Sequence, residues 1–520
     1  MPEGTVAGRW RKPLELPRLP LGDLPRRAAR RWRDRVALRC GRQTLTFMEL
    51  EDRTARCAAA VAKAAGPGAV VGVATVLDPV FAVLYYGVAR ASGTVVTLNP
   101  LIGGEALCRV LATSGARLAF LTQEMAEKIA PFRDRLPDLE TVVVLGRGAA
   151  PPEATVTLDA LFGAAPEASN AYAAEVPDLD ATACLHFTSG TTGAPRAVRL
   201  SHRGLTANAA QTAQAQGLDD TCVTLNQLPL FHIMHLNSAL WAGATQVLCP
   251  DADPAAAVAA ADEHGATHWF SIPVRLARMA ADPGLAQLRP RTVRGIFCGG
   301  SALLAGPARA LAEHFGFPVV QGYGLAEASP TVTLDLPERP RPGSCGPPVA
   351  GTEVRVVDIE TRQVLGPGAR GEIQIRGPQL MSGYQGPQAG AEFEEDGWFS
   401  TRDVGHLDKD GYLFVADRLG DVFKCDNEIV APAEVEGVLA RHPAVRDCVV
   451  FGHPDEFSGA VTHALVVLAG DMRPADVAEA VNHDLAPFQQ IRYIDAVAAV
   501  PRGPGGKVQR RRLRRDTLGI

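Results

Sequence analysis

The sequence contains no hydrophobic run that approaches the roughly 18 residues of a membrane-spanning helix. Its first 12 residues carry charges but lack the apolar segment of a secretory signal peptide. We therefore expect a protein without a membrane span and without a secretory signal.

Paired cysteine motifs are also missing. The 10 cysteines are scattered along the chain, and none forms a Cys-x-x-Cys pair. This spacing favours reduced thiols in the cytoplasm over a disulfide framework or a zinc site. The formal net charge of -5 gives no excess of positive charge, so nucleic acid is not an expected partner.

What is present is the composition of an ordinary globular protein, with 47% hydrophobic and 21% charged residues. Its 520 residues exceed what one domain usually holds. Strand-like and helix-like segments alternate over residues 24–121, and a second block of this kind covers 223–320. The alternation predicts an α/β fold with two subdomains, each a parallel sheet covered by helices.

The segment 343–383 has short β-like runs separated by Gly and Pro, and it predicts a small β-barrel or sheet. A further strand begins at Tyr412 and leads to Asp417, where we place a domain boundary. The expected organisation is an N-terminal domain over 1–416, a hinge over 417–420 and a small α+β domain over 421–520.

A run of small and hydroxyl residues follows Leu185 and Phe187, although the Walker sequence Gly-x-x-x-x-Gly-Lys-Ser/Thr is absent. Such a run cannot build a core, but its backbone N–H and hydroxyl groups can surround a polyphosphate. Arg196 adds a fixed positive charge at its end. The alternative is a flexible surface loop. The run consists of Thr188, Ser189, Gly190, Thr191, Thr192 and Gly193.

Four more signatures follow at wide spacing. In the segment 321–327, Tyr323 can stack on a base and Glu327 can hold Mg²⁺. Asp403 can accept hydrogen bonds from ribose hydroxyls, and Arg418 can serve the same ribose or a phosphate. Lys507 ends the glycine-rich segment 501–507. Taken singly, each also fits a turn, a surface ion pair or a basic tail, and their joint order decides between these interpretations.

That order resembles the adenylate-forming superfamily, which includes acyl-CoA and aryl-CoA ligases, peptide-synthetase adenylation domains and luciferases. The resemblance extends from residue 45 to Lys507. The segments 228–238 and 431–436 resemble the 4-coumarate and fatty-acid CoA ligases in particular. An Asp that would pair with an amino acid's α-amine is missing beside His232, so the amino-acid branch is disfavoured.

The resemblance implies a role for each motif. The run 188–193 would hold the β- and γ-phosphates, Tyr323 would lie against adenine, and Lys507 would bridge the substrate carboxylate and the α-phosphate. The C-terminal domain would be mobile and would turn about Gly420 after adenylation. The remaining implied site consists of Gly322, Gly324, Asp403 and Arg418 for the nucleotide, Glu327 for Mg²⁺, His232 between the acid and the thiol, and His235, Gly299, Gly300, Ser301 and Ala326 for the acid.

The chain departs from the family pattern at several positions. Ala326 replaces the usual Thr before Glu327, Arg196 replaces a Lys, and Arg402 replaces the Gly of a Thr-Gly-Asp motif. Gly420 stands where the hinge usually has Asp or Lys, and Asn427 replaces a Gly that lets the pantetheine arm pass. The nucleotide half-site is therefore better preserved than the acceptor half-site.

These features predict an ATP- and Mg²⁺-dependent ligase that activates an aryl or acyl carboxylate as acyl-AMP and releases pyrophosphate. The acyl group is then expected to be transferred to a thiol, with CoA as the preferred acceptor. The alternatives are a member in specialised biosynthesis that uses a carrier-protein thiol, an amine or nitrite, or a nucleotide-binding homologue with weak catalysis. A metal pair at His232 and His235 is disfavoured because no third ligand is nearby.

Overall fold

The computed structural model describes residues 4–7, 10–145, 155–163, 177–188, 196–303, 305–386, 393–394, 396–426, 428–502, 508 and 510–518. The chain divides into two compact units. The larger contains residues 7–353 and 376–397, and the smaller contains 1–6, 354–375 and 398–520. The domain boundaries expected from the sequence, at residues 416 and 420, stay predictions, because this division follows compactness and not the expected hinge.

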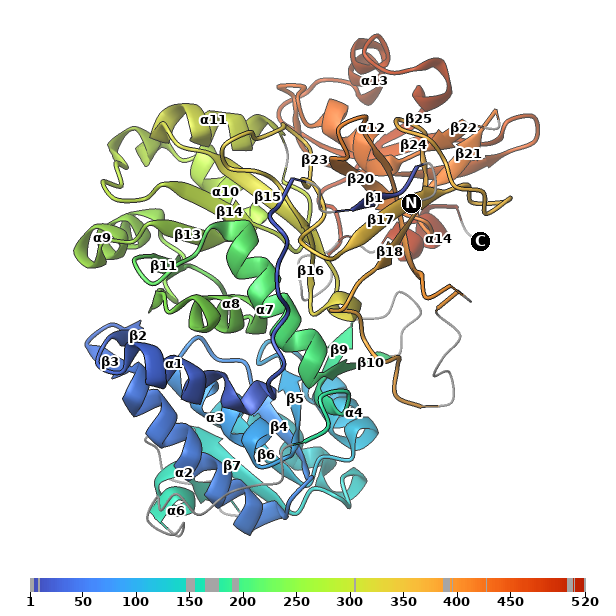
Figure 1. Ribbon diagram of the computed structural model, residues 1–520. Helices are drawn as coiled ribbons and strands as arrows, with labels where there is room; N and C mark the ends of the chain where they lie inside the picture. Colours follow the sequence, from blue (N-terminus) through green and yellow to red (C-terminus); the bar gives the residue numbers. More distant parts are fainter. Residues whose placement is uncertain are drawn as a thin grey trace. The chain divides into compact units, whose positions relative to one another are not determined.

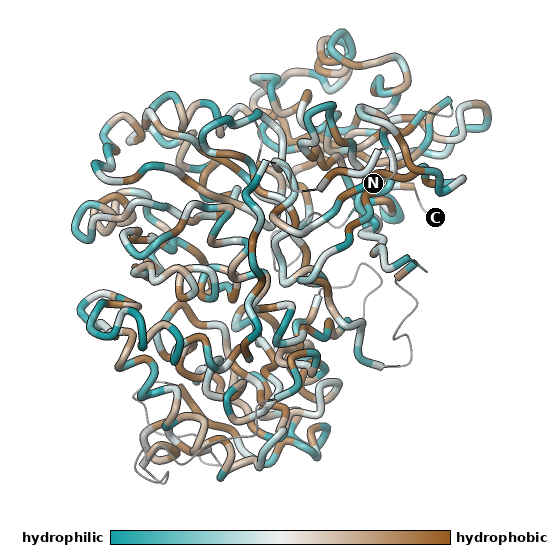
Figure 2. The backbone as a smooth tube through the Cα atoms, viewed as in Figure 1, coloured by the Kyte–Doolittle hydropathy of each residue, from teal (hydrophilic) through white to brown (hydrophobic). Residues whose placement is uncertain are grey.

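The first sheet of the larger unit has the strand order β10-β9-β5-β4-β6-β7-β8. Its strands pair in parallel except β9 and β10, which are antiparallel. The bounds are β4 Val70–Ala74, β5 Thr94–Leu98, β6 Leu118–Thr122, β7 Thr141–Leu145, β8 Thr155–Thr157, β9 Thr182–Thr188 and β10 Arg196–Ser201. The central strands are hydrophobic (Figure 2), as expected of parallel strands covered on both faces.

The second sheet has the order β16-β15-β14-β13-β11-β12-β2-β3. Its bounds are β2 Val36–Cys40, β3 Gln43–Thr46, β11 Val223–Asn226, β12 Thr245–Leu248, β13 His268–Ser271, β14 Gly295–Cys298, β15 Val319–Gly324 and β16 Thr331–Leu334. The block 223–320 is therefore confirmed as a parallel sheet. The structure adds the early hairpin β2–β3, because β2 pairs in parallel with β12.

Helices cover both sheets of the larger unit (Figure 1). Their bounds are α1 Leu24–Trp32, α2 Phe47–Ala65, α3 Pro79–Arg90, α4 Gly104–Ser114, α5 Gln123–Ile129, α6 Leu158–Gly163, α7 His202–Gln216, α8 Ile233–Ala242, α9 Pro254–His264, α10 Pro273–Ala280 and α11 Ala305–Phe315. Short 3₁₀ turns, η1 to η4, cover Leu21–Asp23, Ala130–Arg135, Pro283–Gln287 and Ala326–Ala328. None of the described helices is both long and apolar enough to cross a membrane.

Helix α7 is buried along nearly its whole length, and it packs against strands of both sheets and against α8. A helix that is buried all round must satisfy its polar side chains internally. Asn208 does so by donating to the carbonyl of Thr331 at 3.0 Å and accepting the Thr331 N–H at 3.1 Å. Gln211 donates to the carbonyl of Ala350 at 2.7 Å. These bonds fix the start of β16, which directly follows the turn that carries Glu327.

The smaller unit contains most of a five-stranded sheet with the order β1-β17-β18-β19-β20, which confirms the β-rich segment predicted after residue 343. The pairing of these described strands ends at β1 and β20, and closure into a barrel is not shown. The bounds are β1 Val6–Ala7, β17 Glu353–Val357, β18 Gly371–Arg376, β19 Phe399–Leu407 and β20 Leu413–Arg418.

The rest of the smaller unit is an α+β piece, as expected. Its sheet has the order β22-β21-β24-β23, with β25 paired to β24. Val450, Val466 and Val477 belong to its core, which α12 and α13 cover. The bounds are β21 Phe423–Cys425, β22 Glu428–Val430, α12 Pro432–Leu439, β23 Val445–Asp455, β24 Gly459–Leu468, α13 Pro474–Asn482, η5 Pro487–Gln489, β25 Ile491–Ala496 and α14 Arg510–Leu518.

Candidate active site

Several predicted site residues lie at one edge of the second sheet, at the carboxyl ends of its parallel strands. Gly299 follows β14, and an added Cβ there would lie 3.4 Å from the carbonyl oxygen of Gly322 in β15. Gly300 has a φ of 88°, and Ser301 is exposed. Ligands of open α/β sheets bind outside the carboxyl ends of the strands, so this edge is the expected place for a site.

Gly322 and Gly324 allow β15 to approach β16 closely. A Cβ on Gly322 would lie 3.0 Å from the Thr333 carbonyl oxygen, and one on Gly324 would lie 2.4 Å from that of Pro330. Tyr323, between them, is opposite Thr333 in the antiparallel pairing. The two glycines thus have a packing role in the described structure, while their contact with a nucleotide stays a prediction.

Glu327 lies in the 3₁₀ turn Ala326–Ala328 that follows β15. The hydroxyl of Tyr384 donates a hydrogen bond to its Oε1 at 2.6 Å. The N–H of Met381 donates to the backbone carbonyl of Glu327 at 2.8 Å. Both the carboxylate and the backbone of this residue are therefore held by the segment 381–384, and Ala326 is half-buried beside them.

Tyr384 also contacts Arg196, the residue that follows the predicted phosphate loop. The guanidinium carbon lies 3.7 Å from the centre of the Tyr384 ring, and Tyr384 is bridged to Val198 of β10. Arg196 is opposite Thr188 in the pairing of β10 with β9, so the two ends of the loop lie side by side. One tyrosine thus joins the end of the loop to the carboxylate proposed for Mg²⁺.

Three histidines form a row that the sequence interpretation found only in part. The ring of His232 lies 6.2 Å from that of His235 and 6.4 Å from that of His186, centre to centre. His186 stands in β9, and its Nδ1 is 2.8 Å from Thr97 Oγ1. Its only sequence signal is its place two residues before Thr188. Among the described residues, no group of three or more His, Cys, Asp or Glu could hold a metal ion.

The pKa values of all three imidazoles are lowered from 6.5, which favours their neutral form at physiological pH. The surrounding protein lowers the pKa of His232 to about 4, through lost hydration and the neighbouring His186, although the residue as a whole is exposed. Burial lowers the pKa of His235 well below 6.5, and burial also lowers that of His186, against an opposing effect of Glu327. This row therefore presents no positive charge to a ligand.

Hydrogen bonds decide which nitrogen carries the proton. His232 Nδ1 accepts the N–H of Met234 at 3.3 Å, at the start of α8, so the neutral ring carries its proton on Nε2. His235 is nine-tenths buried and stacks on Phe270 at 4.2 Å, and its buried Nδ1 has no partner. A buried N–H without a partner is rarer than a bare acceptor, so His235 also carries its proton on Nε2. Both rings can therefore donate a hydrogen bond from Nε2.

Asp403 and Arg418 are brought together in the smaller unit. They are opposite each other in the pairing of β19 with β20, and Arg418 Nε lies 2.7 Å from Asp403 Oδ1. The Asp403 side chain is 5% exposed and that of Arg418 is 52% exposed. Arg402, which precedes Asp403 in β19, has a φ of 61°, a left-handed conformation in which glycine is unstrained. Its substitution for Gly therefore adds backbone strain beside Asp403.

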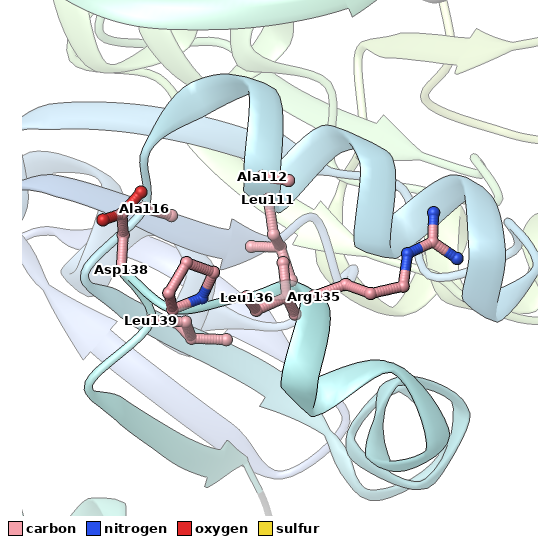
Figure 3. Close-up of a pocket in the computed structure, with 8 residues that line it drawn as sticks. Leu111, Ala112, Ala116, Arg135, Leu136, Asp138 and Leu139 are labelled. Atoms are coloured by element: carbon pink, nitrogen blue, oxygen red, sulfur yellow. The ribbon is translucent and has the colours of Figure 1, made fainter.

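Several predicted residues lie outside the described part of the chain: Ser189, Gly190, Thr191, Thr192, Gly193, Asn427 and Lys507. Gly420 is described and exposed, in a turn where the N–H of Asp421 donates to the carbonyl of Arg418 at 2.9 Å. The surface pocket in Figure 3 is lined by residues from the end of α4 and the segment 135–139. None of the predicted site residues belongs to it.

The Glu327 carboxylate and the Arg196 guanidinium both contact Tyr384, and this arrangement is compatible with a nucleotide-dependent enzyme. Residues 25–385 match the AMP-binding enzymes, and residues 434–507 match the C-terminal domain of AMP-binding enzymes. The chain belongs to this family, the adenylate-forming superfamily, whose members include AMP-forming acid–CoA ligases.

Individual relatives span nearly the whole chain. A feruloyl-CoA synthase of an Amycolatopsis species is 33% identical over 95% of this chain and 98% of its own. The fatty acid–[acyl-carrier-protein] ligase ScoC of Streptomyces coeruleorubidus is 33% identical, over 92% of both chains. The structure of the amide bond synthetase McbA of Marinactinospora thermotolerans matches with a TM-score of 0.83 and 26% identity, over 95% of this chain and 99% of that one. The chain is thus similar to enzymes with three different acyl acceptors.

Proposed function

We propose that the protein uses ATP to convert a carboxylic acid into an acyl-adenylate, where the aryl or medium-size acyl group of the acid carries no further charge. It then transfers the acyl group to a nucleophile, with the thiol of CoA as the first candidate. The observation that carries this proposal is the contact of Arg196 and Glu327 through Tyr384, beside the neutral histidine row. It supports a site for a polyanion next to a site for an uncharged group.

The nucleotide would be held at both ends. Arg196 and the hydroxyl-rich run would take the β- and γ-phosphates, and a single carboxylate with phosphate oxygens is the ligand set that Mg²⁺ prefers. The residues present therefore fit Mg²⁺, with Glu327 as its protein ligand. When bound, the ion supplies positive charge that offsets the triphosphate. The other proposed roles are adenine stacking by Tyr323, ribose binding by Asp403 and Arg418, and bridging of the acid and α-phosphate by Lys507.

In the first half-reaction, a carboxylate oxygen of the acid attacks the α-phosphorus of ATP. The bond from the α-phosphorus to the bridging oxygen breaks, and pyrophosphate leaves. Two anions must meet for this step, so Lys507 and the arginines serve mainly to lower their repulsion and to fix their approach. In the second half-reaction, the nucleophile attacks the acyl carbon, the bond to the AMP oxygen breaks, and the nucleophile loses its proton.

The proposed wall for the acid favours a neutral, flat group. His235 stacks on the buried Phe270, and the Nε2–H of His232 and of His235 can each donate to an oxygen on the acid. A second carboxylate would find no cation among the three imidazoles, because their pKa values are lowered. Hydroxylated or methoxylated aryl acids are thus the first substrates to test.

An amine is the second candidate acceptor, and the charge near Lys424 favours it. Asp426 donates its N–H to the carbonyl of Ser458 at 3.1 Å, which places this turn beside the hairpin that carries Asp455 and Glu456. Lys424 itself pairs with Glu360. In the family this turn borders the path of the thiol arm, and carboxylates there would oppose the phosphates of CoA but attract a protonated amine.

The experiment is detection of AMP by mass spectrometry from ATP, Mg²⁺ and pooled aryl and acyl acids, with CoA, with simple amines, or with neither. AMP that depends on one acid supports the proposal, and the accompanying CoA ester or amide identifies the acceptor. Lys507→Ala should lower acid-dependent AMP formation at least 100-fold, whereas Arg473→Gln, which removes an exposed ion pair with Asp476, should leave it unchanged. AMP formation that survives Lys507→Ala would refute the assigned lysine.

A further inference from the structure

Arg510, the first residue of α14, lies among three carboxylates. Its Nη2 is 2.7 and 2.6 Å from the two oxygens of Glu436, and its Nε donates to the carbonyl of Val450 at 3.0 Å. Its Nη1 is 3.5 Å from Asp417 Oδ1 and 3.6 Å from Asp421 Oδ2. The Arg510 side chain is only 14% exposed. Within this group of four side chains, one positive charge faces three negative charges.

Asp417 is the member of the group that precedes the predicted hinge at Gly420. It belongs to β20, yet its Oδ2 accepts the N–H of Ala433 in the first turn of α12 at 2.9 Å, and its Oδ1 faces Arg510. The Asp417 side chain is 7% exposed, so these contacts are largely shielded from water. One carboxylate therefore ties the strand before the hinge to two helices that follow it.

The contact of Arg510 with Glu436 is closer than its contact with Asp417. Arg510 Nη2 lies 2.7 and 2.6 Å from the two oxygens of Glu436. Both residues follow the predicted hinge, so a rotation about the hinge would not separate them. The contact between Arg510 and Asp417 is longer and crosses the hinge. Burial raises the pKa of the Glu436 carboxyl, and the Arg510 guanidinium opposes this rise.

The neighbours of this contact give it a direction. Asp417 is adjacent to Arg418, which pairs with Asp403 at the proposed ribose site. Arg510 is three residues after Lys507 in the sequence. The proposed roles of Asp403 and Lys507 meet on the same ATP in the first half-reaction. Gly420 has no side chain that could restrain the turn between them.

We propose that Asp417 and Arg510 form a latch across the hinge, which holds the C-terminal α+β piece in the orientation for adenylation and must open before the acyl group is transferred. This inference rests on the proposed two-step function. Asp417 and Arg510 are positioning residues, because they act through the ribose pair and Lys507 without touching the substrate. The latch supplies the restraint that Gly420 does not.

Asp417→Asn tests the latch, because it removes the charge but keeps an oxygen that can accept the Ala433 N–H. We expect pyrophosphate–ATP exchange with the acid found by the AMP screen to fall about tenfold, and transfer from purified acyl-adenylate to change less than twofold. Asp476→Asn, at an exposed ion pair in the same α+β piece, is the matched control and should change neither rate. Equal losses in both half-reactions, or no loss in either, would overturn the latch.

A second measurement needs no substrate. Trypsin cleaves after arginine, and Arg418 at the end of β20 is half-exposed, so we expect a cut there. The full-length Asp417→Asn protein should be cut there at least five times faster than the wild type, and Asp476→Asn should be cut at the wild-type rate. An unchanged cleavage rate in Asp417→Asn would refute the latch. This result does not depend on the AMP screen, because a wild type that forms no AMP with any acid would count against the proposed function and not against the latch.

Discussion

The most direct test of the polyphosphate site is Tyr384→Phe. This change removes one hydroxyl, the donor to Glu327 Oε1 at 2.6 Å, and keeps the ring on which Arg196 lies. The backbone contacts between the segment 381–385 and β10 do not depend on that hydroxyl. The perturbation is thus confined to how the Glu327 carboxylate is held.

The expected magnitude follows from the charge on the acceptor. A hydrogen bond to an ionised group contributes about 1.5–3 kcal/mol, which corresponds to about 10–150-fold in a rate or binding constant. Removing a group that orients a metal-binding carboxylate commonly costs about 10–100-fold in metal affinity or activity. We therefore expect pyrophosphate–ATP exchange to fall about 10–100-fold, together with a rise in the Mg²⁺ concentration that gives half-maximal exchange.

The assay is exchange of labelled pyrophosphate into ATP with the activated acid, measured over a series of Mg²⁺ concentrations. Tyr86→Phe is the matched control, because it also loses one buried hydroxyl, which donates to the neutral amide of Asn237 at 2.8 Å. Since Asn237 carries no charge, the control should leave the Mg²⁺ dependence unchanged. Glu327→Gln combined with Tyr384→Phe should cost little more than Glu327→Gln alone, because both changes act on one group.

An unchanged Mg²⁺ dependence in Tyr384→Phe would refute the reasoning that this hydroxyl orients the metal-binding carboxylate. Fully additive effects of Glu327→Gln and Tyr384→Phe would refute the assignment of Tyr384 as acting through Glu327.

Three further predictions concern single residues. Burial lowers the pKa of His202 from 6.5 to about 4, so the free energy of unfolding should be highest above pH 6.5 and should fall by up to about 3 kcal/mol as the pH falls towards 4. In His202→Asn, the amide Oδ1 can replace Nδ1 as acceptor of the Leu21 N–H. Urea unfolding of this variant should therefore depend less on pH over the same range. The surrounding protein lowers the pKa of His232 to about 4, so this residue should not titrate near pH 6.5. The pH dependence of kcat/KM near pH 6.5 should therefore be the same in the wild type and in His232→Asn. Gly346→Ala should lower the free energy of thermal unfolding by about 3 kcal/mol, because φ is 77° and the new Cβ would lie 2.2 Å from Asp335 N. The control Gly343→Ala has a similar φ of 80° but open space around the new Cβ, so it should cost about 1 kcal/mol.

The sequence predicted the elements whose signals are local. Helices and strands alternate over the block 24–121 as expected, and β17 and β18 lie where short β-like runs stand between Gly and Pro. The same periodicity cannot tell which strands become neighbours, since that depends on partners far along the chain. The hairpin β2–β3 therefore joins the second sheet, where no local pattern assigns it.

The candidate site shows the same limit. Motif order gave Glu327, Asp403 and Arg418, because each stands in a recognisable run of residues. Tyr384 and His186 were missed, since each contacts a residue far away in the sequence: Glu327 is 57 positions from Tyr384, and Thr97 is 89 positions from His186. Their signals are a tyrosine after a glycine and a histidine two residues before Thr188, and both are too common to single out.

The pairing of β2 with β12 has a consequence for synthesis. The hairpin β2–β3 leaves the ribosome about two hundred residues before the strand that it joins. At about 5–20 residues per second, the edge of β2 waits on the order of 10–40 seconds with its backbone groups open to other chains. Leu38 and Leu45, which are fully buried in the finished protein, are uncovered for part of that interval. Slow codons between residues 50 and 245 would lengthen this exposure, so the yield of folded protein depends on translation speed in that stretch.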